Sequence, residues 1–130
     1  MKKYAMLNVS MILEILDGID EETAWGVLDS VVSLYTKETP ENIARLKQYL
    51  ADENYDSIAT LVHKMKNDHG MIGAYQAAKL CKNIESQIQA GQTDDLPDMI
   101  DQLEILYYAV VMELQSLKEA GSSALFQATE

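Results

Sequence analysis

The sequence has few of the residues that favour a β-sheet or an irregular fold. Its 130 residues include two prolines, six glycines and one phenylalanine, with no sustained alternation of Val, Ile or Thr with polar residues. Leu, Ala, Glu, Lys, Gln and Met recur instead at the spacing of amphipathic helices. We therefore predict an all-α protein whose length suits one domain with a single core.

Cysteine and long apolar runs are scarce as well. The single cysteine, Cys81, leaves no internal disulfide and is typical of a reducing compartment. A signal peptide is not predicted, because Asn8 and Glu14 interrupt the apolar stretch after the first lysines and no small-residue cleavage site follows. No run reaches the roughly 18 apolar residues of a spanning helix. We expect a cytoplasmic protein that has no contact with a membrane.

Basic residues are in the minority. The formal net charge of -11 disfavours nucleic-acid binding, because a phosphate backbone would be repelled. From His63 to Lys82, however, four lysines face one acid, a local +3, while the rest of the chain has six basic and 20 acidic residues, a net -14. Such a basic island suits an anionic group or an acidic docking surface. Lysines on a solvated helix face are also common, and both readings remain open.

Apolar stripes and capping residues predict four long helices. Asp20 is a plausible N-cap for the first, and Pro40 leaves open whether there are two helices here or a single bent one. We prefer the bent helix, because no glycine or polar linker separates its halves. The four helices are predicted to run from Asp20 to about Ala51, from the N-cap Asn54 to the turn at Gly73, from Ala74 to Gln89, and from Leu96 to Leu117.

The two ends of the chain receive separate predictions. Residues 1–18 are expected to hold an N-terminal lid helix, about Met6 to Asp17, that ends at Gly18. Residues 121–130 lack an apolar pattern and are expected to be a disordered or weakly docked tail. Short loops between the long helices predict an antiparallel up-down four-helix bundle over residues 1–120, with the lid as an addition.

Most sequence signals for catalysis are missing. There is no phosphate-binding glycine loop, Gly-x-Ser-x-Gly elbow or ATP-binding pattern. The Glu-x-x-His pairs of di-metal bundles are absent, because Thr60 and Lys66 stand three residues before the two histidines. His63 and His69 lie about 240° apart around a helix, so they do not share a metal ion from one face. We predict neither a metal site nor a self-contained enzyme.

The two histidines differ in their predicted surroundings. His69 lies at the edge of the apolar stripe with Met65 and is predicted to be a partly buried, hydrogen-bonded core residue. His63 falls on the opposite, solvated face with Lys66, Asn67 and Gly70. An isolated surface histidine usually has no function, but a neighbouring lysine and glycine make His63 the candidate functional residue.

These residues carry a resemblance to a known family. The sequence resembles the histidine-containing phosphotransfer (HPt) domains, whose signature is a phosphoacceptor His, Lys at +3, a small residue at +4, Gly-Ala at +10 and +11, and then Cys-x-x-x-Glu/Gln. The matching residues, in order and spacing, are His63, Lys66, Gly73-Ala74, Cys81 and Glu85. The likeness covers roughly Glu21 to Leu117. Asn67 departs from the signature at +4. His69 and Gly70 also depart from it, because they stand where Ser and Ala are usual.

The resemblance implies a stand-alone phosphocarrier without kinase activity of its own. His63 would be the phosphoacceptor, Lys66 would neutralise phosphoryl oxygens, and Glu85 would orient the imidazole and stabilise its cation. Partner docking is assigned to Lys64, Asn67, Gly70 and Lys82. The expected partners of this monomer are receiver domains of response regulators or hybrid histidine kinases; the protein itself needs no cofactor, and any Mg²⁺ is expected on the receiver.

Two other functions remain open. The domain could keep the fold but only sequester a receiver or another partner without transfer, a reading that Asn67 favours because it could crowd the acceptor. It could also be a structural adaptor whose His63 face is merely solvated. Transfer of labelled phosphate to His63 distinguishes the phosphocarrier from the binding module and the structural adaptor.

Overall fold

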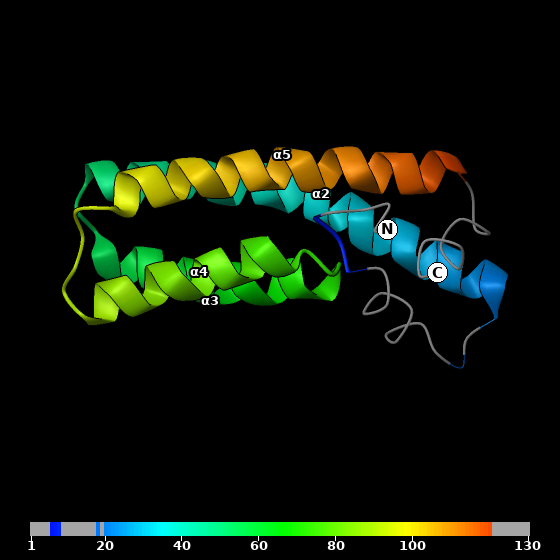
Figure 1. The fold of residues 1–130 in the computed structure, drawn as a ribbon, viewed down its shortest axis with the longest axis horizontal. Helices are drawn as coiled ribbons and strands as arrows, with labels where there is room; N and C mark the ends of the chain where they lie inside the picture. Colours follow the sequence, from blue (N-terminus) through cyan, green and yellow to red (C-terminus); the bar gives the residue numbers. More distant parts are fainter. Residues whose placement is uncertain (1–5, 9–17, 19, 121–130) are drawn as a thin grey trace.

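The part of the chain that the structure describes is helical. The computed structural model describes residues 6–8, 18 and 20–120 (Figure 1). Within these residues there are four α-helices and no strand: α2 (Glu21–Ala51), α3 (Tyr55–Met71), α4 (Tyr75–Gln89) and α5 (Leu96–Ala120). The predicted all-α bundle is confirmed, and each of its four helices is found within a few residues of its expected bounds.

Helix α2 is continuous through Pro40. Asp20 caps its start, because its side chain accepts a hydrogen bond from the Thr23 amide at 2.9 Å. A proline inside a helix removes the amide that would bond the carbonyl four residues earlier, here that of Thr36. The Tyr107 hydroxyl of α5 donates to this Thr36 carbonyl at 3.2 Å. A side chain of a neighbouring helix thus replaces the missing donor, and the single-helix prediction is confirmed.

The helix that carries His63, α3, begins at a side-chain N-cap and ends at a glycine turn. Asn54 is its N-cap and accepts a hydrogen bond from the Ser57 amide at 3.3 Å. After Met71 the chain turns through Gly73, whose φ of 76° is readily adopted by glycine. Because only Ile72 to Ala74 separate the two helices, α3 and α4 are antiparallel neighbours.

The helices form a bundle with two diagonal pairs. Helix α3 packs against α4 and α2, and α5 packs against α2 and α4, which places α3 and α5 on opposite corners. Figure 1 shows α2 and α5 extending past the ends of α3 and α4. The outward faces of α3 and α5 therefore lie on different sides of the molecule.

The core consists of apolar residues from all four helices. Its fully buried members lie at three- and four-residue spacing, as an amphipathic helix requires. The largest of them are Leu46, Ile58, Val62, Met65, Ile72, Ile84, Leu96, Ile100, Leu103 and Leu117. This periodicity determines which side chains of α3 and α4 are left to face solvent.

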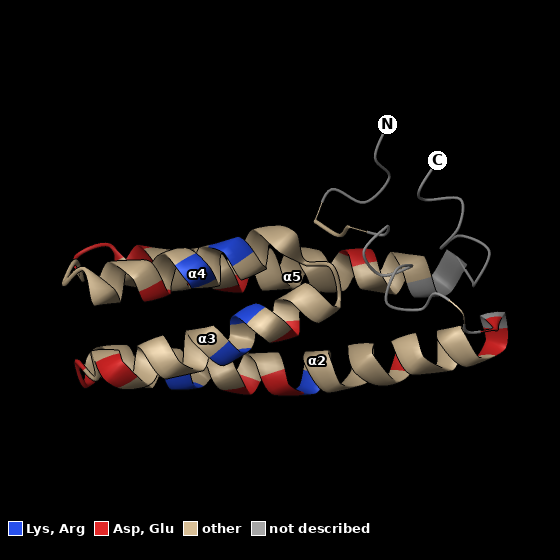
Figure 2. Cartoon of the chain, turned by 90° about the horizontal axis from the view of Figure 1, so that it is seen from below, with Lys and Arg blue, Asp and Glu red and all other residues tan. Residues whose placement is uncertain are grey.

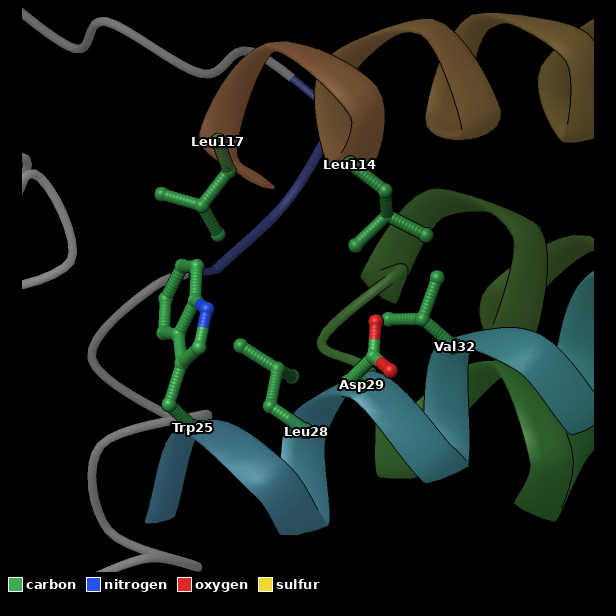
Figure 3. Close-up of a pocket in the computed structure, with 6 residues that line it drawn as sticks. All are labelled: Trp25, Leu28, Asp29, Val32, Leu114 and Leu117. Carbon is green, nitrogen blue, oxygen red and sulfur yellow. The ribbon is translucent and has the colours of Figure 1, made fainter. Parts of the chain in front are cut away.

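A small apolar pocket lies where only α2 and α5 face each other. Figure 3 shows Trp25 and Leu28 of α2 opposite Leu114 and Leu117 of α5, with Asp29 and Val32 completing the lining. This pocket lies apart from His63, because neither α3 nor α4 contributes to it. It is not part of the candidate site.

The first described residues, Met6 to Asn8, run from α5 to the turn between α3 and α4. The Asn8 amide donates to the Gly73 carbonyl at 2.7 Å, and the Met6 amide donates to both Glu113 carboxylate oxygens at 3.0 and 2.9 Å. Leu7 between them is buried. Met6, Leu7 and Asn8 are not helical. The rest of the predicted lid helix, and the predicted tail, lie outside the described residues.

None of the described helices is long and apolar enough to span a bilayer.

Candidate functional site

The candidate site is centred on a contact between α3 and α4. His63 Nδ1 lies 2.8 Å from Glu85 Oε2. The His63 side chain is 59% exposed, whereas that of Glu85 is 20% exposed. An ionised carboxylate can only accept a hydrogen bond, so Nδ1 carries the ring proton and Nε2 is left with its lone pair. The result is an accessible imidazole held in one tautomer.

Burial of the neighbouring side chains sets the direction of both residues. On α3, Val62 and Met65 are buried on either side of His63, which turns the histidine outward. On α4, Cys81 and Ile84 are buried and place Glu85 at the border of the core. Because the two helices run antiparallel in close contact, the two border positions meet.

Lys66 completes the group from one turn further along α3. Its Nζ lies 4.0 Å from Glu85 Oε1, the oxygen that does not bond His63. The Lys66 side chain is 29% exposed, so its charge is only partly solvated. One carboxylate therefore contacts both the histidine and a lysine, and the structure brings together the three residues to which the sequence assigned the chemistry.

The four residues assigned to docking do not share one environment. Asn67 and Lys82 are exposed, and a Cβ at the half-buried Gly70 would meet no atom within 4 Å. Lys64 instead pairs with Asp68 at 3.1 Å and Glu38 of α2 at 3.6 Å. The hydrogen bond to Asp68 raises the pKa of Lys64. Lys64 thus joins α3 to α2 beside the site, a role that spacing along one helix did not reveal.

The second histidine of α3 is in the core. His69 is 1% exposed, and its Nδ1 lies 2.8 Å from the Tyr35 hydroxyl of α2. Burial lowers the pKa of His69 to about 4, so the ring is neutral. Its predicted burial is confirmed, but only one ring nitrogen is paired: Nε2 has no hydrogen-bond partner in the described part of the chain.

Sequence reasoning missed Tyr35 and Asn8. Tyr35 lies on the apolar stripe of α2, and nothing in the local sequence indicates a hydrogen bond to a residue 34 positions later. Asn8 packs against Gly73, where an added Cβ would lie 2.7 Å from the Asn8 carbonyl oxygen. The sequence predicted a turn at Gly73, but it gave no indication that the segment around Asn8 packs against this glycine.

Charge is distributed as the sequence suggested. Figure 2 shows basic segments in the middle of α3 and α4, whereas acidic segments lie along α2 and α5 and at the ends of the bundle. The four lysines that make up the basic island are Lys64, Lys66, Lys79 and Lys82. Among the described residues, no three His, Cys, Asp or Glu side chains are grouped closely enough to hold a metal ion.

An antiparallel helical bundle that presents one carboxylate-bound histidine defines a class of protein, the histidine phosphotransfer modules. The family model of the Hpt domain matches residues 30–120, and the chain belongs to this family. It is a histidine phosphotransfer protein of phosphorelays. Proteins of the family are phosphocarriers and interact with receiver domains of two-component systems.

A solved structure agrees with the fold. The chain is similar to histidine-containing phosphotransfer protein B (HptB) from Pseudomonas aeruginosa PAO1, with 19% sequence identity and a TM-score of 0.74, over 89% of this chain and 96% of that one. At this identity the likeness shows the fold alone. A comparison with curated proteins gave no significant match.

Proposed function

We propose that His63 is the phosphoacceptor, and that it takes a phosphoryl group from the phospho-aspartate of one receiver domain and passes it to the aspartate of another. The observation that carries this proposal is the 2.8 Å contact between His63 Nδ1 and Glu85 Oε2. It leaves Nε2 on an exposed ring as the free nucleophile. His69 is unsuitable for this role because it is buried.

The reaction follows from this tautomer. Nε2 attacks the phosphorus of the aspartyl phosphate, the bond between phosphorus and the aspartate oxygen breaks, and the aspartate leaves as a carboxylate. His63 becomes a phospho-imidazolium whose Nδ1 proton stays on the ring. Glu85 stabilises this positive ring through its hydrogen bond. Attack by the second aspartate on the same phosphorus returns the neutral imidazole.

Lys66 supplies positive charge for the phosphoryl oxygens. In the unphosphorylated state its ammonium lies 4.0 Å from Glu85 Oε1, one helical turn from His63. A phosphoryl group on Nε2 places new negative charge in reach of this flexible side chain, and the interaction strengthens as charge develops in the transition state.

The surroundings of His63 suit a receiver. We assign the docking rim around His63 to the exposed Asn67 and Lys82 and the half-buried Gly70, with Lys64 on the side towards α2. A receiver active site is acidic and supplies its own Mg²⁺, so the basic rim provides complementary charge. We place this phosphocarrier in the cytoplasm, as a monomer without kinase activity or a cofactor of its own.

Transfer of label tests the proposal. The protein is incubated with a receiver phosphorylated with ³²P in the presence of Mg²⁺, and acid-labile, base-stable phosphate on the chain is measured. We expect label on the wild type and none on His63→Gln, with unchanged helicity by circular dichroism. Equal labelling of both proteins would refute the assignment. A stable complex that leaves His63 unlabelled would indicate a binding module instead.

A further inference from the structure

The outward face of α5 combines two features. Its middle part exposes three large apolar side chains, Ile105 at 61%, Tyr108 at 57% and Met112 at 69%. Spacings of three and four residues place them on one stripe. Towards the helix start the same stripe continues with Asp98 and Asp101, both exposed. We call these five residues the α5 stripe.

Such a stripe is unusual on a soluble helix. Single exposed apolar residues need no explanation, but three in succession along one face mark an interaction surface. Neither Asp98 nor Asp101 has an ion pair in the described part of the chain, although Asp101 helps to raise the pKa of nearby Lys47. Lys47 is hydrogen-bonded to Glu104 at 2.8 Å. Asp98 and Asp101 therefore lie on an exposed face without a salt bridge of their own to a described residue.

We propose that the α5 stripe binds a cationic amphipathic helix of a partner protein. Apolar residues of that helix would cover Ile105, Tyr108 and Met112, and its lysines or arginines would lie against Asp98 and Asp101. Two helices would pack side by side, with apolar anchors at helical spacing and with charge that determines their orientation.

A second copy of this chain fits the stripe less well. Fully covering one large side chain buries roughly 150–250 Å², so three partly exposed ones offer on the order of 400 Å² per protomer. Two copies would then bury about 800 Å², below the roughly 1,200–2,000 Å² of a stable interface, and a partner helix on the same stripe would bury a similar area. Charge separates the two occupants, because the net charge of -11 on each copy opposes pairing. A partner of opposite charge gains attraction where a second copy meets repulsion.

The stripe is separate from the phosphotransfer site. Helices α3 and α5 are diagonal in the bundle, so the α5 stripe faces away from His63. Binding there is compatible with a receiver docked on α3 and α4. This inference goes beyond the proposed function and stands whether or not His63 is phosphorylated.

Peptide binding to the full chain tests the inference. The probe is a fluorescent synthetic peptide with leucines at helical spacing and lysines on the flank, titrated by anisotropy and mapped by amide chemical shifts. We expect the chemical-shift changes on α5. The dissociation constant of the peptide should rise about tenfold or more for Met112→Glu and for the double variant Asp98→Asn/Asp101→Asn. The matched control is Glu22→Gln/Glu41→Gln, which alters charge equally on exposed α2 positions and should bind as the wild type does.

Three results would overturn the inference. Equal weakening in both charge-matched double variants would mean non-specific attraction of the peptide to an acidic protein. Chemical shifts confined to α3 and α4 would place the peptide at the His63 face. Concentration-dependent dimerisation in sedimentation that Met112→Glu abolishes would identify a second copy as the occupant. All substitutions are at exposed helix positions, and circular dichroism checks that each variant is folded.

Discussion

His63 Nδ1 and Glu85 Oε2 lie 2.8 Å apart across the interface of α3 and α4, and the other oxygen of Glu85 lies 4.0 Å from Lys66 Nζ. Glu85 thus has two partners of different chemistry. One contact sets the tautomer of the imidazole, and the other holds a cation within reach of its free nitrogen. The first two predictions separate these contributions.

Loss of the Glu85 carboxylate should slow phosphotransfer. A hydrogen bond to a charged group contributes about 1.5–3 kcal/mol, so Glu85→Ala is expected to reduce the transfer rate about tenfold to a hundredfold. Glu85→Gln keeps an acceptor oxygen and should lose less. Rapid-quench measurement of label on His63 reports both rates. A rate for Glu85→Ala equal to that of the wild type would show that the contact does not prepare the imidazole.

Lys66 and Lys64 should differ, although both are lysines of the same helix. Lys66→Met removes the cation that shares the Glu85 carboxylate with His63 and should lower the transfer rate about tenfold or more. Lys64→Met breaks pairs with Asp68 and Glu38 at the side of the site and should have a small effect on the rate. Thermal unfolding should change little for Lys64→Met, because exposed ion pairs contribute about 0–1 kcal/mol, and little for Lys66→Met, because the half-buried contact of Lys66 with Glu85 is 4.0 Å long. A larger rate loss for Lys64→Met would move the functional cation to that residue.

Lys82 should act on association rather than on the chemical step. It is exposed on α4, three residues before Glu85, and forms no ion pair with any described residue. Reversing its charge with Lys82→Glu should slow transfer at low receiver concentration and weaken the salt dependence of the rate. Lys37→Glu makes the same charge change on an exposed position of α2 and serves as the control. Equal behaviour of the two variants would show that only net charge matters.

His69 should make the stability of the fold depend on pH. Burial lowers its pKa to about 4, against 6.5 for an unperturbed histidine. Between these values the unfolded chain binds more protons than the folded one, so stability is fully present above pH 6.5 and falls as the pH is lowered towards 4. The full loss is about 3 kcal/mol.

Urea unfolding at pH 7 and pH 5 measures this effect. The double variant Tyr35→Phe/His69→Phe removes the titrating ring together with the hydroxyl that is hydrogen-bonded to it. It should lose less stability than the wild type between the two pH values, whereas other titrating groups contribute equally to both proteins. The same pH dependence in both would assign it to groups other than His69.

Of the two glycines Gly70 and Gly73, Gly73 should tolerate substitution by alanine less well. Its φ is 76°, and a Cβ there would lie 2.7 Å from the Asn8 carbonyl oxygen. Gly73→Ala is therefore expected to lower the free energy of unfolding by about 1–3 kcal/mol. Gly70 lies inside α3 with open space around it, so Gly70→Ala should be neutral or stabilise by up to about 1 kcal/mol. A small effect of Gly73→Ala would mean that the backbone of Met6–Asn8 moves away from the added methyl group without a loss of stability.

Sequence alone determined the helices and the composition of the site. Apolar periodicity and the caps Asp20 and Asn54 are local properties, because each depends on residues within one or two turns of the helix. The spacing of His63 and Lys66 follows from the same periodicity. The placement of Glu85 beside His63 came through the family resemblance, since the relation between two helices is not contained in the periodicity of either one.

Only the tertiary structure decided the contacts that join distant segments. The sequence favoured one helix through Pro40 but contained no partner for the carbonyl that the proline leaves unpaired, and the structure supplies that partner in the Tyr107 hydroxyl. In the same way, the pairing of Tyr35 with His69, of Lys64 with Glu38 and of Asn8 with Gly73 depends on which faces pack together. These partners are remote in sequence, so their meeting follows from the packing of the whole bundle and not from any local propensity.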